Sequence, residues 1–223
     1  TEPTTVTTET MIWDGSYLTE IALYDSLLRH RQTQAQTYGG RLISQTVYDS
    51  YGRIRFTSEP AFNNESGPTG QLVWVTRTND VARTEYHYDG AGRVTDEVFV
   101  VKDEEKWRTS YRNGGHDDHW MTTMIAPQGG TSTATLTNAQ GRTVQLRQYH
   151  QRSAVGEFDA VGYQYNRHGR LAQVTDSAGN AWQFEYDLRG RQVTAHDPDT
   201  GTTTNTYNPA GQITSVTDSN GTT

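Results

Sequence analysis

The last quarter of the chain, from Tyr165 onward, repeats itself every 21 residues. Each repeat opens with a tyrosine, followed by Asp or Asn, two variable residues, Gly and then Arg or Gln. The three tyrosines are Tyr165, Tyr186 and Tyr207. A second turn-like sequence keeps the same period and begins at Asp176, Asp197 and Asp218. Two interleaved turns per period predict a pair of short strands in each repeat, so the chain is first of all a repeat array.

The same signature can be followed toward the N-terminus with wider and irregular spacing. It recurs at Tyr24, where Leu28 takes the place of Gly, at Tyr48 and at Tyr88, and at Thr137, where the tyrosine is lost. The longer steps contain stretches rich in Gly and Pro, at 60–68, 113–116 and 126–130, which predict loop insertions. We therefore expect an extended N-terminal extension (1–16), an irregular repeat region with insertions (17–162) and regular 21-residue repeats (163–223). Together they form one continuous array, and we expect it to be a fragment of a larger protein because both ends look cut.

Alternating aromatic and polar residues predict strands at 72–76, 83–88, 161–165 and 182–186. Residues 18–28 are the one stretch with a helical alternative, since Leu18, Ile21, Ala22 and Leu28 would share part of a helical face. Ile21, Leu23 and Tyr24 also continue the pattern of a strand followed by the signature, and we favour strands. The expected fold is all-β, with antiparallel hairpin repeats forming a curved, spiralling sheet.

Each residue of the signature has a predicted role in turn formation. The Asp or Asn can hydrogen-bond the backbone two residues on, and the Gly is expected at positive φ. The Arg can reach the preceding Asp or a carboxylate of the neighbouring repeat, and the tyrosine rings are expected to lie near one another as a ladder. Apolar residues follow the Arg at both odd and even positions of the strand, as at Leu171 and Val174 or Ile213 and Val216. Either a bulge or burial on both faces would explain them.

Composition excludes several classes of protein. Only 32% of residues are hydrophobic and the mean hydropathy is −0.83, so a thick core is not expected. Regularly placed aromatic residues (5 Trp, 13 Tyr and 5 Phe) argue against disorder. The net charge of −7 argues against nucleic acid as the main partner. No apolar run approaches a membrane span, and the absence of cysteine excludes disulfides and thiol catalysis.

At these residues the chain resembles the YD-repeat, or Rhs-repeat, family. Tyr186-Asp187-Leu188-Arg189-Gly190-Arg191 is close to the family consensus, and Asp197-Pro198-Asp199-Thr200-Gly201 resembles its second turn. The family includes bacterial Rhs and wall-associated polymorphic toxins, the shell component of insecticidal toxin complexes, and teneurins. The resemblance implies one arc of a hollow β shell around a C-terminal toxin or other cargo, in a secreted or cell-surface bacterial protein. The family's self-cleavage motif is not visible, because Asp197-Pro198 lies within an ordinary repeat turn.

Three groups of residues are candidates for chemistry. His116-Asp117-Asp118-His119 could contribute metal ligands, Asp103-Glu104-Glu105 could supply paired carboxylates for glycoside hydrolysis, and Trp107, Trp120 and Trp182 could stack on sugar rings. We favour a solvated loop for the His116 group and a solvated run of charges for the Asp103 group. For the tryptophans we favour packing between strands.

We therefore predict no catalytic, cofactor-binding or metal site, no cofactor and no enzymatic activity. The expected function is a structural shell segment, and the alternative is an extracellular adhesion or carbohydrate-binding module. The expected partners are the remainder of its own chain and further copies joined edge to edge, with a glycan under the alternative.

Overall fold

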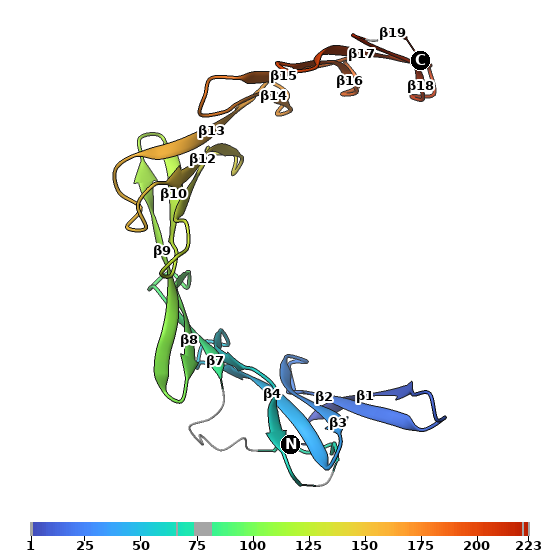
Figure 1. Ribbon diagram of the computed structural model, residues 1–223, viewed down its shortest axis with the longest axis vertical. Coiled ribbons are helices and arrows are strands. Elements are labelled where there is room, and N and C mark those ends of the chain that lie inside the picture. Colours follow the sequence, from blue (N-terminus) through green and yellow to red (C-terminus); the bar gives the residue numbers. More distant parts are fainter. Residues whose placement is uncertain (1, 66, 74–81, 220, 223) are drawn as a thin grey trace. The chain divides into compact units, whose positions relative to one another are not determined.

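The computed structural model describes residues 2–65, 67–73, 82–219 and 221–222 (Figure 1). In these residues the chain forms strands joined by turns and loops, and no helix occurs among them. The expected all-β architecture of antiparallel hairpins is confirmed. Strands also replace the helical alternative at residues 18–28, because Tyr17–Tyr24 forms β2.

The chain forms two compact units, Thr1–Ser110 and Tyr111–Thr223. The strands of the first unit are β1 (Thr4–Met11), β2 (Tyr17–Tyr24), β3 (His30–Thr37), β4 (Gly40–Tyr48), β5 (Ile54–Ser58), β6 (Ala61–Asn63), β7 (Arg83–Tyr88) and β8 (Val94–Val101). Those of the second are β10 (His119–Ile125), β11 (Thr133–Thr137), β12 (Thr143–Tyr149), β13 (Phe158–Tyr165), β14 (Leu171–Thr175), β15 (Ala181–Tyr186), β16 (Gln192–Asp197), β17 (Gly201–Tyr207), β18 (Ile213–Asp218) and β19 (Gly221–Thr222). The division between the two units falls inside β9 (Glu104–His116).

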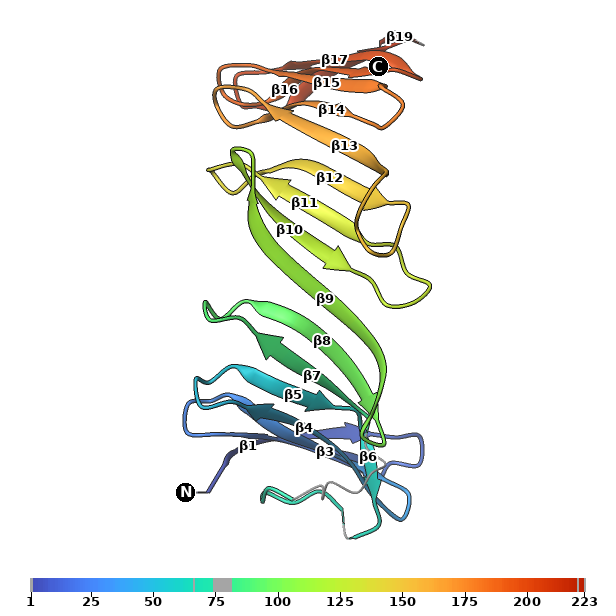
Figure 2. The same ribbon diagram turned by 90° about the vertical axis from the view of Figure 1, so that its left-hand side faces the viewer.

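Strands pair with their neighbours in the chain, always antiparallel (Figure 2). The stretch 1–16, expected to be an extension, contributes β1, which pairs with β2 from Thr4↔Tyr24 to Met11↔Tyr17. The exception to simple succession is β4, because its first half pairs with β6 and its second half with β5, which in turn pairs with β7. Of the strand expected at 72–76, residues 74–76 lie outside the described residues, and Leu72 and Val73 are not in a strand.

A bulge follows the signature turn in each hairpin. Val47 pairs with Phe56 but Tyr48 pairs with Ile54, so Arg55 is an extra residue on β5. Register shifts at the same place occur in the other hairpins closed by the signature, those of β2–β3, β7–β8, β11–β12, β13–β14, β15–β16 and β17–β18. An extra residue changes which face the following side chains occupy. A bulge, one of the two explanations that the sequence allowed, is therefore present where apolar residues occupy both odd and even positions after the Arg.

The buried core is small in both units, as the composition predicts. In the second unit it consists of Ala134, Leu136 and Tyr149, against which Met121 and Val144 pack. A thin core of this size means that polar contacts must also hold the strands and turns in place.

The first unit buries amides and a guanidinium beside its apolar side chains. Gln32 and Gln34 are at most 2% exposed, as is Arg41. The Gln32 amide donates to the Val73 carbonyl (2.7 Å) and accepts from the Val73 N–H (3.0 Å), as a paired strand would. Arg41 donates to Glu65 (3.0 Å), so side chains fasten the loop after β6 to the sheet.

Candidate functional site

The recurring signature forms one kind of turn, seen at Asp49. Its Oδ1 accepts hydrogen bonds from the N–H groups of Tyr51 and Arg53, both at 2.9 Å. The backbone closes the turn, because Asp49 N–H donates to the Arg53 carbonyl (2.8 Å) and Gly52 N–H donates to the Asp49 carbonyl (3.0 Å). Gly52 has a φ of 80°, which a side chain disfavours. The predicted roles of the Asp and the Gly are thus confirmed.

The Arg that ends the signature forms an ion pair with the Asp at its second position. Arg53 Nε and Nη2 lie 2.8 and 2.7 Å from Asp49 Oδ2. The same pairing joins Asp25 to Arg29, Asp89 to Arg93 and Asp187 to Arg191. At Asp89, the N–H of Arg93 and then its guanidinium hold the pKa of the carboxyl below its usual value.

The same guanidinium also covers the tyrosine that opens the next turn. The Arg Cζ lies 4.4–4.8 Å from the next ring centroid in most repeats: Arg29 over Tyr48, Arg53 over Tyr88, Arg142 over Tyr165 and Arg191 over Tyr207. The tyrosine hydroxyl donates back to the carbonyl of the residue after that Arg, as in Tyr48 to His30 (3.0 Å), Tyr88 to Ile54 (2.6 Å), Tyr165 to Thr143 (2.8 Å) and Tyr207 to Gln192 (2.7 Å). We call this alternation of Asp or Asn, Arg and Tyr from turn to turn the turn ladder.

The turn ladder differs from the expected stack of tyrosine rings. Among the described residues, each ring–ring contact involves a pair other than two signature tyrosines, such as Phe99 with Trp107 or Tyr149 with Phe158. The arginine between two successive tyrosines lies over the ring of the next tyrosine and also pairs with the carboxylate of its own turn. Of the two carboxylates that the sequence allowed, the Arg pairs with the Asp of its own turn, and the neighbouring repeat supplies a ring.

The signature glycine has a second role at the ladder. A Cβ placed on Gly169 would lie 2.6 Å from Nη1 of Arg142, the arginine of the preceding turn, and one on Gly52 would lie 2.8 Å from Nη1 of Arg29. The glycine thus leaves room for the arginine of the turn before it. Because alternate turns of an antiparallel meander share an edge, the signature turns of each unit line one edge of its strands (Figure 1).

The candidate metal ligands lie in the turn between β9 and β10. His116 Nδ1 is 3.2 Å from Asp117 and His119 Nδ1 is 2.7 Å from Asp118, so the residues form two separate pairs. The guanidinium of Arg147 lies 3.4 Å from His116 Nε2. No group of three potential metal ligands occurs among the residues that the structure describes.

The candidate carboxylates are each paired with a cation. Glu104 lies 2.7 Å from Lys106, and Glu105 lies 2.7 Å from Arg108. Hydrogen bonds from these cations lower the pKa of both carboxyls. A general acid for glycoside hydrolysis needs a raised pKa, so this geometry favours surface ion pairs. Asp103 is likewise paired, with Arg83 at 2.9 Å.

Trp107 and Trp182 contact protein groups that compete with a sugar. Trp107 stacks on Phe99 with 5.3 Å between ring centroids, and the Trp182 indole N–H donates to Asp197 (3.0 Å). Trp120 is 43% exposed.

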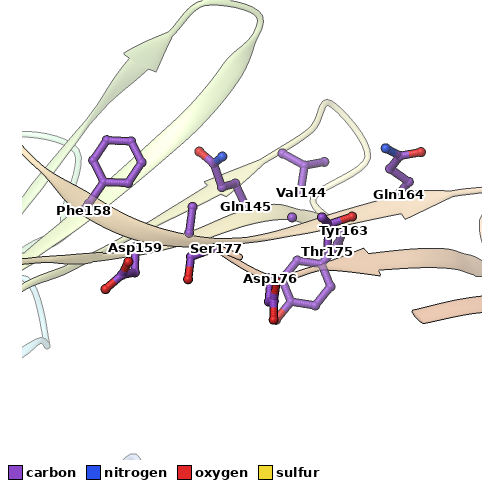
Figure 3. Close-up of a pocket in the computed structure, with 11 residues that line it drawn as sticks. Val144, Gln145, Phe158, Asp159, Tyr163, Gln164, Thr175, Asp176 and Ser177 are labelled. Carbon is purple, nitrogen blue, oxygen red and sulfur yellow. The ribbon is translucent and has the colours of Figure 1, made fainter. Parts of the chain in front are cut away.

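Sequence reasoning missed a different surface feature, a hollow on the face of the strands at Gly162 (Figure 3). Its only signal in the sequence is a glycine within an alternating strand.

Comparison with known proteins identifies the repeats. Residues 165–202 match the family model described as RHS Repeat. Residues 165–202 are thus an RHS-repeat segment. In the described part of the chain, no helix is long and apolar enough to cross a membrane.

Relatives and solved structures extend the likeness beyond these residues. The chain is 24% identical over 155 residues to double-stranded DNA deaminase toxin A of Burkholderia cenocepacia (strain H111), a match covering 62% of the chain and 11% of that protein. The crystal structure of TcdB2-TccC3-TEV matches 97% of the chain with a TM-score of 0.72 at 16% identity. The Tc holotoxin pore of Photorhabdus luminescens matches 98% with a TM-score of 0.70. The chain spans about an eighth of these structures (12% of each), and their fold is shared along nearly its whole length.

Proposed function

We propose that this RHS-repeat segment is a structural, non-catalytic part of a β shell that encloses or carries a toxin in a secreted or surface-delivered bacterial protein. The observation that carries the proposal is the fold shared with TcdB2-TccC3-TEV over 97% of the chain. The name of the Burkholderia relative, a toxin, supports the same context. The chain matches 11–12% of these proteins, so the remaining wall and the cargo would come from the rest of a longer chain.

The turn ladder supports a structural wall rather than an active site. The side chains that recur with the signature are engaged within and between turns: the Asp by the Arg of its own turn, the Arg by the next ring, and the Tyr by the preceding backbone. Groups bound in this way hold successive hairpins in register and are not free to act on a substrate. The regular edge that results can be extended by adding hairpins, which is what a shell requires.

Protection of the cargo tests the shell. In the longer protein that contains this segment, we expect the portion after the repeats to resist protease while the shell is closed. Arg53→Met with Arg191→Met, which removes two links of the ladder, should accelerate its cleavage. Equal cleavage of the enclosed portion and of the same portion expressed alone would contradict the proposal.

Deaminase assays test the non-catalytic part of the proposal, because one relative is named as a double-stranded DNA deaminase. The 223-residue chain should not convert cytosine or adenine in duplex DNA, and turnover above the buffer blank would overturn this part.

We also propose that the outer edge of β1, whose eight residues are all exposed, pairs with a further strand or a second copy. Sedimentation that shows only monomer at high concentration would contradict pairing between copies.

A further inference from the structure

Gly162 lies in the middle of β13 although its own backbone does not require a glycine. It is absent from the positive-φ positions, and a Cβ built on it would meet only the Thr175 carbonyl, at 4.0 Å. The equivalent positions one and two repeats later, 21 and 42 residues on, are Gln183 and Thr204. The fold therefore accepts a side chain at this position, and glycine there leaves backbone uncovered.

A hollow of about 560 Å³ lies over this bare backbone, in the range of small-molecule sites (roughly 300–1,000 Å³). Val144, Gln145, Phe158, Ala160, Gln164 and Thr175 are among the residues that line it. Figure 3 shows Phe158, Gln145 and Gln164 on one side of the ribbon, with Asp159 and Asp176 on the other. The two carboxylates thus point away from the amides and the phenyl ring.

On the side of the hollow away from Asp159 and Asp176, the amides and the hydroxyl have unused hydrogen-bonding capacity. Gln164 is exposed, and its amide makes no hydrogen bond within the described part of the chain. Gln145 accepts from Arg147 Nε through Oε1 (2.7 Å), which leaves its NH₂ group to donate. The Thr175 hydroxyl accepts from Gln173 (2.9 Å) and can donate outward. Phe158 lies at one end and is 38% exposed, with Arg147 Cζ 4.6 Å from its ring centroid and Tyr149 in edge contact with it.

We propose that this hollow binds one ring of a neutral oligosaccharide. A pyranose presents hydroxyls to amide and hydroxyl groups and a C–H face to an apolar surface, and the bare backbone at Gly162 lets the ring approach the strand. The amides and the Thr175 hydroxyl match the hydroxyls of an uncharged ring, and the Arg147 guanidinium is already engaged by Gln145 and Phe158. The site does not depend on the shell proposal, because a wall segment and an adhesion module could both carry it.

Saturation-transfer NMR of the 223-residue chain with maltohexaose, cellohexaose and chitohexaose tests the site. At least one should bind, and Gly162→Gln, which copies Gln183, should weaken binding about tenfold or more, since a filled hollow excludes the ring. Gln164→Ala should weaken it roughly threefold to tenfold, in line with one lost hydrogen bond.

A matched control is available in the last repeats. Thr204→Gln places the same side chain at the equivalent position on β17 and should leave binding unchanged. The thermal midpoint of Gly162→Gln should not fall, which separates a filled site from a damaged fold. The assignment is overturned if none of the three oligosaccharides binds, or if Gly162→Gln binds the same sugar as tightly as the original chain.

Discussion

The contact between Arg53 and Tyr88 is the strongest single test of the turn ladder. Arg53 Cζ lies 4.4 Å from the Tyr88 ring centroid, and the Tyr88 hydroxyl donates to the Ile54 carbonyl at 2.6 Å. The Arg53 side chain is 31% exposed, so its interaction with the ring is only partly screened by solvent. Both interactions connect one turn to the next, and neither belongs to the local turn.

The structure sets the size of the effect. A partly exposed cation over a ring contributes about 0.5–1 kcal/mol, and a neutral hydrogen bond contributes about 0.5–1.5 kcal/mol. Tyr88→Phe should therefore lower the free energy of unfolding by about 0.5–1.5 kcal/mol. Tyr88→Leu loses both interactions and should lower it by about 1–2.5 kcal/mol.

A double-mutant cycle isolates the contact between the two side chains. Arg53→Met and Tyr88→Leu are measured alone and together by urea unfolding, with hydrogen exchange of the turn at 88–93 as a local readout. The lost ion pair with Asp49 is common to the Arg53 single and double variants and cancels in the cycle. We expect a coupling of about 0.5–1 kcal/mol.

The control pair is Arg29→Met with Tyr88→Leu, because Arg29 covers Tyr48. Its coupling should be near zero, within roughly 0.3–0.5 kcal/mol. A coupling for Arg53 and Tyr88 that equals the control, or a Tyr88→Phe variant as stable as the original chain, would refute the ladder.

Two further predictions concern the glycine and the aspartate of the signature. Gly190→Ala should destabilise the chain more than Gly179→Ala, measured by thermal unfolding. Both glycines have φ near 90°, but only a Cβ on Gly190 meets the guanidinium of Arg170. In an Arg170→Ala background, the two substitutions should therefore destabilise the chain equally. Asp187 has a lowered pKa, caused first by the N–H of Arg191, so its contribution is present above the unfolded pKa and is lost as pH falls through the folded value. Asp187→Asn should flatten the dependence of stability on pH below about 4 relative to the original chain, and an unchanged profile would contradict this assignment.

The turns were predictable from the sequence because their chemistry is local. Asp49 needs only the N–H groups two and four residues on, and Gly52 needs only its own φ. Such requirements recur at fixed spacing, so they survive the insertions between repeats. The all-β hairpin organisation follows from the same local pattern.

Contacts between repeats were less predictable because their partners are far apart in the chain. The Tyr88 hydroxyl reaches a carbonyl 34 residues earlier, and Gln32 bonds Val73 across 41 residues. An arginine beside an aspartate suggests an ion pair, but nothing in its spacing shows which ring it covers. The buried glutamines had no sequence signal either, since glutamine is usually exposed.

The choice between Asp and Asn at the second position of the signature affects the link to the next turn. Where an aspartate holds its arginine, the guanidinium lies 4.4 or 4.5 Å from the next ring, as at Tyr88 and Tyr207. After asparagine turns the distance is 4.8 Å for Arg142 and 5.8 Å for Arg170. A carboxylate fixes the guanidinium through two of its nitrogens, and an amide lacks the charge to do so. The local turn therefore forms with either residue, while the guanidinium lies closer to the next ring after an aspartate turn than after an asparagine turn.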